Sequence, residues 1–196
     1  MPKPKLTKRQ AQARKTKSNI YKVATQLMDK KGFNNTTIEE ISKKAKVSVG
    51  TFYLYYRSKD EIFQELFYKA DAYFKNQVAP RLKGKNALDQ IASFFQYYAR
   101  YNQARGLDAI RQLYNTKNKL FIAKNRYMHL LLMQLIEAGQ QQREIIPDDS
   151  PQNIADYLFV MARGIVYDWC LHDGDYDLEA VMRRHITRLL VIFKKC

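Results

Sequence analysis

Apolar residues recur every three or four positions along most of the chain, which is the spacing of one face of an α-helix. No stretch shows the alternation of apolar and polar residues that a half-buried β-strand requires. Prolines and glycines interrupt the pattern and divide it into separate helices. The pattern predicts an all-α fold of about nine helices, over residues 16–31, 37–44, 48–55, 59–80, 86–102, 106–114, 118–142, 151–171 and 176–194.

The second and third predicted helices are short and closely spaced. Thr37 with Glu40 forms a capping box, in which each side chain binds the other residue's backbone N–H at the start of a helix. Ser48 offers a second N-cap, and Ser58 with Glu61 forms a further capping box. Three helix starts within about twenty residues leave room for two short helices and a tight turn, which is a helix-turn-helix that docks on DNA.

Positive charge is concentrated near the N-terminus. Residues 1–60 carry 15 Lys and Arg against 4 Asp and Glu, whereas residues 61–196 carry 19 against 15, so +11 of the net charge of +15 lies in less than a third of the chain. A basic segment that carries a binding motif is typical of nucleic-acid-binding proteins. Residues 1–15 contain two prolines and no apolar periodicity, so we expect a flexible basic arm that either reaches the DNA or adds diffuse attraction.

Three sequence runs stand in a fixed order around the motif, at residues 32–38 (GFNNTTI), 47–56 (VSVGTFYLYY) and 58–62 (SKDEI). Together with Ala24 and Leu27 in the first helix, they resemble the tetracycline-repressor (TetR) family of bacterial regulators over residues 16–65. The resemblance implies a three-helix DNA-binding domain at residues 16–62 and a helical domain for effector binding and dimerisation at residues 63–196. Beyond the matched part the resemblance is one of helical architecture only.

The third helix is expected to enter the major groove, because an α-helix fits that groove and the groove distinguishes all four base pairs. Phe52 and Tyr56 lie four residues apart and should anchor the helix inward. Gly50 favours close approach of the backbone to DNA, with helix packing as the alternative. Thr37 and Lys59 are predicted to hold phosphates, because free N–H groups at helix starts attract anions. The predicted DNA-binding residues are Thr37, Ser48, Val49, Gly50, Thr51, Tyr53, Leu54, Tyr55 and Lys59.

The third helix contains no Arg or Lys before Arg57. Because Arg and Lys are the side chains that read guanine most often, we expect an operator that relies on A·T steps. The resemblance implies base or phosphate contacts at four positions of this helix, those of Thr51, Tyr53, Leu54 and Tyr55.

The last two helices carry broad apolar stripes, and the resemblance implies that they pair with their copies in a homodimer through residues 151–194. Charged substitutions at Ile186 or Leu189 should then give monomers. The alternative for both stripes is ordinary core within one chain.

The resemblance also implies a ligand cavity in the second domain. Its helices are rich in tyrosine, whose buried hydroxyl groups need partners, and small-molecule pockets are mostly apolar with a few polar groups. Packed core is the alternative for each candidate. The residues predicted to line the cavity are Phe67, Phe95, Tyr98, Tyr127, Met128, Met161 and Trp169.

The sequence favours a sequence-specific transcriptional regulator, a repressor that binds an inverted-repeat operator as a dimer and is released by a small, largely apolar ligand. The alternative is a DNA-binding architectural or partner-controlled protein without a small-molecule effector. No nucleophile elbow, phosphate loop or dinucleotide fingerprint supports an enzyme, and no cofactor is predicted.

Metal and membrane sites are not expected either. The run from Cys170 to His172 offers only two soft ligands, so no metal site is predicted. No apolar run reaches the length of a membrane span, the N-terminal residues lack the apolar core of a signal peptide, and two cysteines fit a reducing compartment. We therefore expect a cytoplasmic protein whose partners are double-stranded DNA, a second copy of itself and a small molecule.

Overall fold

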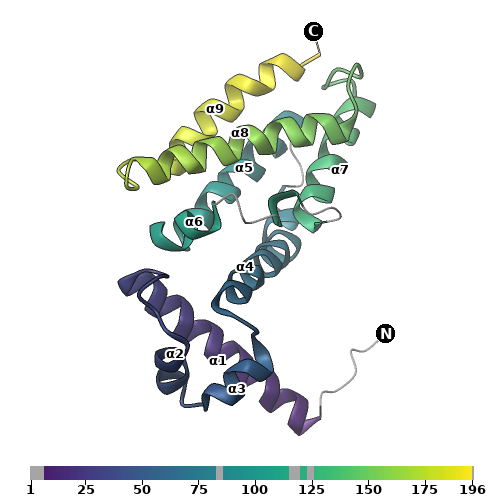
Figure 1. Ribbon diagram of the computed structural model, residues 1–196. Helices are drawn as coiled ribbons and strands as arrows, with labels where there is room; N and C mark the ends of the chain where they lie inside the picture. The colour runs from purple at the N-terminus through teal and green to yellow at the C-terminus, as the bar shows by residue number, and fades with distance from the viewer. Residues whose placement is uncertain (1–6, 83–85, 115–119, 123–125, 196) are drawn as a thin grey trace. The chain divides into compact units, whose positions relative to one another are not determined.

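The computed structural model describes residues 7–82, 86–114, 120–122 and 126–195 (Figure 1). Contacts divide the chain into two compact units, Met1–Leu66 and Phe67–Cys196, which we call the head and the body. Every regular element among the described residues is helical, apart from one isolated β-bridge. The all-α fold predicted from the sequence is confirmed.

The helices of the head are α1 (Lys8–Lys31), α2 (Ile38–Ala45), α3 (Val49–Tyr55) and the first turns of α4 (Lys59–Tyr73), which continues into the body. Ile20, Ile41 and Phe52, one from each of the first three helices, are fully buried and form the centre of the core. The Asn19 side-chain amide donates to the Ala45 carbonyl at 2.9 Å, which fastens the end of α2 to α1.

The first helix begins at Lys8, well before its predicted start, so residues 8–15 are helical and not part of a flexible arm. Thr7 and Gln10 form a capping box, with Gln10 N donating to Thr7 Oγ1 at 3.2 Å and Thr7 N to Gln10 Oε1 at 3.0 Å. The residues that follow are mostly Lys, Arg, Gln and Ala, which form helices readily without an apolar face. Apolar periodicity alone therefore does not predict this start. Residues 1–6 lie outside the described part of the chain.

Short polar side chains define the starts of α2 and α3. Glu40 N donates to Thr37 Oγ1 at 3.2 Å, and Thr37 N donates to the Glu40 carboxylate at 3.4 Å. Thr51 N donates to Ser48 Oγ at 3.0 Å. Lys46 ends α2 in the left-handed conformation, with φ of 57°, which turns the chain between the two helices. Both predicted N-caps and the tight turn are confirmed.

The body contains the second half of α4, a π-helical segment (Phe74–Val78), a 3-10 turn (Ala79–Arg81), α5 (Ala87–Gln103), α6 (Leu107–Leu113), a second 3-10 turn (Leu120–Ile122), α7 (Tyr127–Gln141), α8 (Pro151–Leu171) and α9 (Leu178–Phe193). The central helix α5 packs against α7, α8 and α9. Phe94 and Phe95 of α5 pack edge-to-face, 5.1 Å between ring centroids, and Phe159 of α8 lies 5.6 Å from Phe95. These rings form the centre of the core of the body.

Two predicted helices of the body have different bounds. The fourth helix does not run as regular α-helix to Pro80, because proline lacks the N–H that an α-helix needs there, and the chain changes to π and 3-10 geometry after Tyr73. The helix predicted over 118–142 begins at Tyr127, because Arg126 has an extended backbone. Residues 118–119 and 123–125 lie outside the described residues.

Candidate DNA interface

The inward face of α3 anchors the helix in the head. Phe52 is fully buried and Tyr56 is 1% exposed, with 5.9 Å between their ring centroids. The Tyr56 hydroxyl donates to the carboxylate of Glu65 in α4, and the Lys17 ammonium of α1 lies 3.7 Å from the same carboxylate. Burial and the adjacent Glu65 carboxylate raise the pKa of Tyr56, so its hydroxyl stays protonated and donates. The predicted inward face is confirmed.

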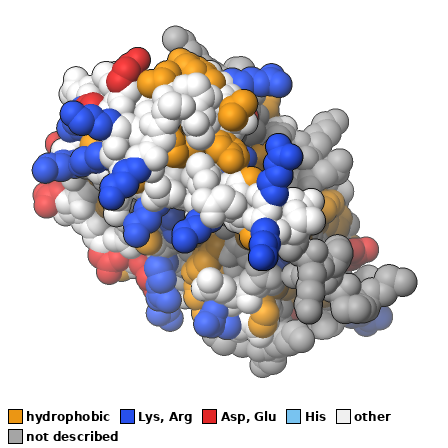
Figure 2. All heavy atoms as spheres, turned by 90° about the horizontal axis from the view of Figure 1, so that it is seen from below, with side chains coloured by type: hydrophobic (Ala, Val, Ile, Leu, Met, Phe, Trp, Pro, Cys, Tyr) orange, Lys and Arg blue, Asp and Glu red, His pale blue; other side chains and the backbone are white. Residues whose placement is uncertain are grey.

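The outward face of α3 carries large exposed side chains. Val49, Tyr53 and Leu54 expose 37%, 53% and 81% of their surface, while Thr51 and Tyr55 are half-buried. A group of exposed apolar side chains bordered by polar ones marks a contact surface. In the face drawn in Figure 2, hydrophobic side chains lie among Lys and Arg side chains, which attract phosphate groups. The head therefore presents both kinds of group that a DNA-binding surface needs.

Gly50 lies at the exposed start of α3. A Cβ atom added there would meet Ser48 Oγ at 3.8 Å, an ordinary contact, and no other described group that would oppose it. Packing inside the head thus does not require glycine, which removes the packing alternative. The hydroxyl groups of Ser48 and Thr51 lie 2.8 Å apart, and Ser48 also caps the helix. Both hydroxyls are therefore partly used within the chain.

Thr37 and Lys59, the two predicted phosphate contacts, have different surroundings. Thr37 is exposed at the start of α2. The half-buried Lys59 ammonium donates to the carbonyl groups of Phe33 at 2.9 Å and Thr36 at 2.6 Å, and lies 4.5 Å from the Phe33 ring centroid. Because these carbonyls lie just before Thr37, Lys59 fastens the loop that leads into α2. The side chain of Lys59 thus positions the start of α2, and the phosphate contact at Lys59 stays a prediction.

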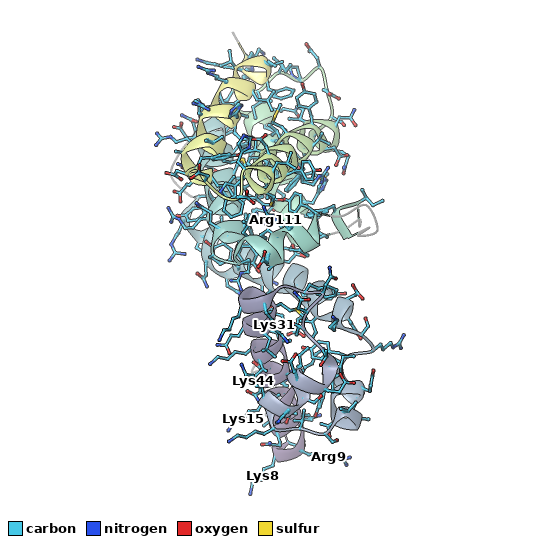
Figure 3. The ribbon with its side chains drawn as sticks, turned by 60° about the vertical axis from the view of Figure 1, so that its left-hand side comes forward. Lys8, Arg9, Lys15, Lys31, Lys44 and Arg111 are labelled. Atoms are coloured by element: carbon cyan, nitrogen blue, oxygen red, sulfur yellow. The ribbon has the colours of Figure 1, made fainter. Side chains whose placement is uncertain are left out.

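The head also carries exposed lysines on α1 and α2. Lys8 and Lys15 of α1 and Lys44 of α2 point outward in Figure 3, and none of the three has a carboxylate partner among the described residues. Lys31, in contrast, pairs with Glu40, and this hydrogen bond is the main cause that lowers the pKa of Glu40. One of the two acids in the first turn of α2 is therefore neutralised, whereas much of the basic charge of the head remains available.

The residues predicted to line a ligand pocket lie in different parts of the body. Phe95 and Tyr98 are buried on α5, and Phe159, which the sequence did not single out, lies 5.6 and 6.1 Å from their ring centroids. Met128 is also buried, at the start of α7. Met161 is 36% exposed on α8 and lies outside this cluster.

Trp169 and Tyr127 lie apart from the aromatic cluster. The Trp169 indole N–H donates to the Tyr176 carbonyl at 3.0 Å, beyond the end of α8. Trp169 follows Phe159 by ten residues on α8, which is about 15 Å along the helix axis at 1.5 Å per residue. Tyr127 is half-buried at the start of α7. The side chain of Phe67 lies outside the described residues, so the structure brings together Phe95 and Tyr98 but not the whole predicted set.

One face of α8 is apolar and exposed. Its large side chains expose at least half of their surface, at Tyr157 (52%), Val160 (62%), Tyr167 (50%) and Leu171 (62%). Their spacing of three, four and seven residues places them on one side of the helix. Gly164 lies among them, and a Cβ atom added there would have nothing within 4 Å. Tyr157 packs on Phe193 of α9, with 5.8 Å between ring centroids, and the rest of this face is open among the described residues.

The corresponding stripe on α9 faces mainly inward. Ile186 is fully buried and Leu189 is 8% exposed, because both pack into the core of their own chain. The expectation that charges at these positions would report on a dimer is therefore wrong, since they would disrupt the fold itself. Val191 and Ile192 are the exposed apolar residues near the end of α9, at 68% and 62%.

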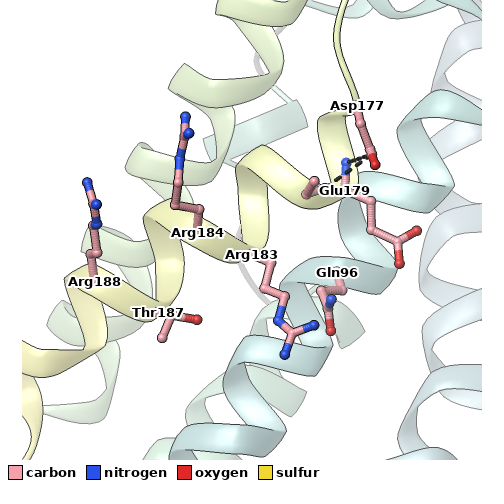
Figure 4. A pocket seen from close by; sticks show the side chains of 8 residues that line it. Gln96, Asp177, Glu179, Arg183, Arg184, Thr187 and Arg188 are labelled. Atoms are coloured by element: carbon pink, nitrogen blue, oxygen red, sulfur yellow. Dashed lines mark hydrogen bonds between the residues drawn. The ribbon is translucent and has the colours of Figure 1, made fainter.

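Three arginines of α9 line a surface hollow of about 760 Å³ beside Gln96 of α5 (Figure 4). Arg184 and Arg188 point in one direction, and Arg183 points toward Gln96. The acid Glu179 in the same hollow is already bound by Arg100, at 2.6 and 2.9 Å. The guanidinium groups do not converge on one point, so this hollow is an open basic surface.

No described helix is both long and apolar enough to cross a membrane. No three His, Cys, Asp or Glu side chains of the described residues gather as a metal ion would need. Burial raises the pKa of the Cys170 thiol to about 11, which keeps it protonated and unreactive.

Comparison with known proteins identifies relatives. Residues 20–66 match the family described as bacterial regulatory proteins of the tetR family. The chain is 24% identical over 184 residues to the HTH-type transcriptional regulator TcmR of Streptomyces glaucescens. The aligned region covers 88% of this chain and 80% of TcmR. It is also 30% identical over 145 residues to the HTH-type transcriptional repressor NicS of Pseudomonas putida. That aligned region covers 67% of this chain and 66% of NicS.

Solved structures share the fold. The transcriptional regulator FadR from Bacillus subtilis superposes with a TM-score of 0.73 at 22% identity, over 89% of this chain and 97% of FadR. The matched sequence segment contains α2, the first two turns of α4, and α3, whose outward face is described above. The chain belongs to the TetR family of DNA-binding transcriptional regulators.

Proposed function

We propose that the protein is a repressor that binds an inverted-repeat operator as a homodimer and is released by a small, largely apolar ligand. The observation that carries the DNA-binding part is the outward face of α3, where Tyr53 and Leu54 are exposed beside Gly50. Apolar side chains read thymine methyl groups and groove shape, and α3 contains no Arg or Lys to read guanine. We therefore expect an operator with A·T steps at the positions that α3 contacts.

Phosphate contacts come from the start of α2 in this proposal. The free N–H groups and the dipole of its first turn attract a phosphate next to the exposed Thr37. Lys59 contributes to phosphate binding indirectly, because its side chain holds the loop that positions Thr37. Exposed lysines such as Lys15 and Lys44 add attraction that is independent of sequence.

The exposed apolar face of α8 supports a homodimer. Val160 and Tyr167 lie on this face on either side of Gly164. A glycine in the middle of a helix costs about 0.5–1 kcal/mol relative to alanine, and close approach of a partner helix would offset this cost. A two-fold dimer presents two copies of α3 to half-sites about one helical turn apart, which is why we expect an inverted repeat.

The ligand response is inferred from the body and from relatives. FadR from Bacillus subtilis was solved in complex with stearoyl-CoA, and FadR from Thermus thermophilus in complex with lauroyl-CoA. In this chain, the rings of Phe95, Tyr98 and Phe159 would supply the apolar walls of a pocket. NicS is named a repressor, which supports repression over activation here.

Selection of binding sites from a pool of random duplex DNA tests the proposal. We expect enrichment of an inverted repeat bound by one dimer or by a pair of dimers. Salt-sensitive binding without any enriched sequence would mean that the head holds DNA without reading it, which would favour an architectural role.

A further inference from the structure

Two tyrosine hydroxyl groups meet inside the body. Tyr98 of α5 is 6% exposed, and its hydroxyl oxygen lies 2.8 Å from that of Tyr114, which follows the end of α6. The pair carries two hydroxyl protons, and the hydrogen bond between them uses one. Among the described residues, no acceptor takes the second proton. An unused donor in the interior is unfavourable, so the pair is suited to donate to a group that is not part of the chain.

Arg163 of α8 brings positive charge to the same place. Its guanidinium carbon lies 5.9 Å from the Phe121 ring centroid, and the Phe121 ring lies 4.7 Å from the ring of Tyr114. Burial raises the pKa of Tyr98 and of Tyr114, and the charge of Arg163 acts on both in the opposite direction. Its hydrogen bond to the Phe121 carbonyl is long, at 3.5 Å. No carboxylate of the described residues lies within ion-pair distance of Arg163. The charge of Arg163 lowers the pKa of Asp156 on the same helix, but Asp156 is already bound by two other side chains.

Arg105 is a second arginine with an unused hydrogen-bond donor. It lies just beyond the end of α5, two helical turns after Tyr98. Nε of Arg105 is buried and has no hydrogen-bond partner among the described residues, while its guanidinium carbon lies 4.5 Å from the Tyr101 ring centroid. Arg126, in contrast, is paired with Asp71 at 3.2 Å. Arg105 and Arg163 are both half-buried, and neither forms an ion pair with a carboxylate of the described residues, so a bound anion beside either would be stabilised.

We propose that Tyr98, Tyr114 and Arg163 bind the oxyanion of the effector, a carboxylate or a comparable group. Arg163 would supply charge-assisted hydrogen bonds, and the tyrosine pair would donate its unused proton. The apolar part of the effector would lie against Phe95 and Phe159, whose ring centroids are 5.6 Å apart. The inference rests on the proposed ligand response and narrows the effector to amphipathic anions.

Two fluorescent probes that share the same aromatic rings test this site in the full-length protein without DNA. Anilinonaphthalene sulfonate carries an oxyanion, and phenylnaphthylamine lacks it. We expect the anionic probe to bind more tightly. Arg163→Gln should weaken the anionic probe by about tenfold and leave the neutral probe nearly unchanged, because only the charge-assisted contact is lost. Arg184→Gln, which removes an exposed arginine of α9, is the matched control and should change neither affinity.

Tyr114→Phe provides a second variant in case Arg163→Gln does not fold. It removes one hydroxyl without changing volume, and should weaken the anionic probe by about threefold and spare the neutral one. Equal losses for both probes, or unchanged affinity of the anionic probe in both variants, would overturn the anion site while leaving an apolar pocket in place. Binding of neither probe to the wild-type protein would overturn the proposed ligand response itself, and the inference with it.

Discussion

The head carries its unused chemical groups on its surface, whereas the body carries them in its interior. In the head these groups lie outside, as the exposed Tyr53 and Leu54 of α3 and the exposed lysines of α1 and α2. In the body they lie inside, as the Tyr98 and Tyr114 hydroxyl pair beside Arg163. The difference indicates that the head is suited to a large partner that stays outside the protein, and that the body is suited to a small one that it encloses.

The glycines of the two units sharpen this comparison. A Cβ atom at Gly139 would lie 2.7 Å from Ala87 and Ile145, so packing within the chain explains that glycine. A Cβ atom at Gly50 or Gly164 would meet open space or one ordinary contact. Packing among the described residues therefore does not explain glycine at these two positions, which supports the proposed close approach of DNA to α3 and of a second copy to α8.

The largest effect is expected from a charge on the exposed face of α8. Val160 is 62% exposed, so Val160→Glu should leave the monomer folded but separate the two copies. Loss of the second half-site contact should weaken binding to the inverted repeat by about a hundredfold or more. Sedimentation and operator titration measure both effects. Ile122→Glu, at a residue 73% exposed outside this face, is the control. A persistent dimer in the Val160 variant would place the interface elsewhere.

Tyr53→Ala should have the next largest effect, and it concerns sequence reading. Because Tyr53 is 53% exposed, its removal should not change the stability of the head. We expect affinity for the selected operator to fall by about tenfold to a hundredfold, with little change on random DNA. Tyr68→Ala removes another exposed tyrosine, in α4, and should leave both affinities unchanged. Equal losses on the two DNAs would remove Tyr53 from base reading.

Lys59→Met distinguishes a positioning role from direct contact with phosphate. Removing the ammonium frees the carbonyl groups of Phe33 and Thr36 and loosens the start of α2, so operator affinity should fall by about tenfold. The dependence of affinity on salt should keep its slope, because no phosphate contact is lost. Titrations at several salt concentrations give both values. A slope lower by about one ion would show that Lys59 contacts DNA directly.

Most of the head could be predicted because its signals are local. The Thr37 and Ser48 caps each act on an N–H three residues ahead, and Phe52 and Tyr56 reveal the inward face by their spacing. The early start of α1 was missed because Thr7 caps a segment without apolar periodicity. A helix start of this kind can be predicted from the sequence when capping residues such as Thr7 are considered independently of apolar periodicity.

Contacts between distant segments could not be predicted in the same way. Lys59 binds carbonyl groups 23 and 26 residues away, which no local pattern reveals. The apolar stripe of α9 is broad, so the sequence could not show that Ile186 is buried in its own chain. The Tyr98 and Tyr114 pair with Arg163 depends on how α5, α6 and α8 pack together, and neither spacing nor composition indicates it.

Gly50→Ala tests the central claim most directly, because it separates the stability of the head from its binding to DNA. The free energy of unfolding and the affinity for the selected operator would be measured on the same full-length variant. The open space around Gly50 predicts unchanged or higher stability, by up to about 1 kcal/mol, together with operator affinity that falls by about tenfold or more. Unchanged operator affinity would contradict the close approach of DNA to α3. A loss of stability large enough to explain weaker binding would instead show that Gly50 serves the fold.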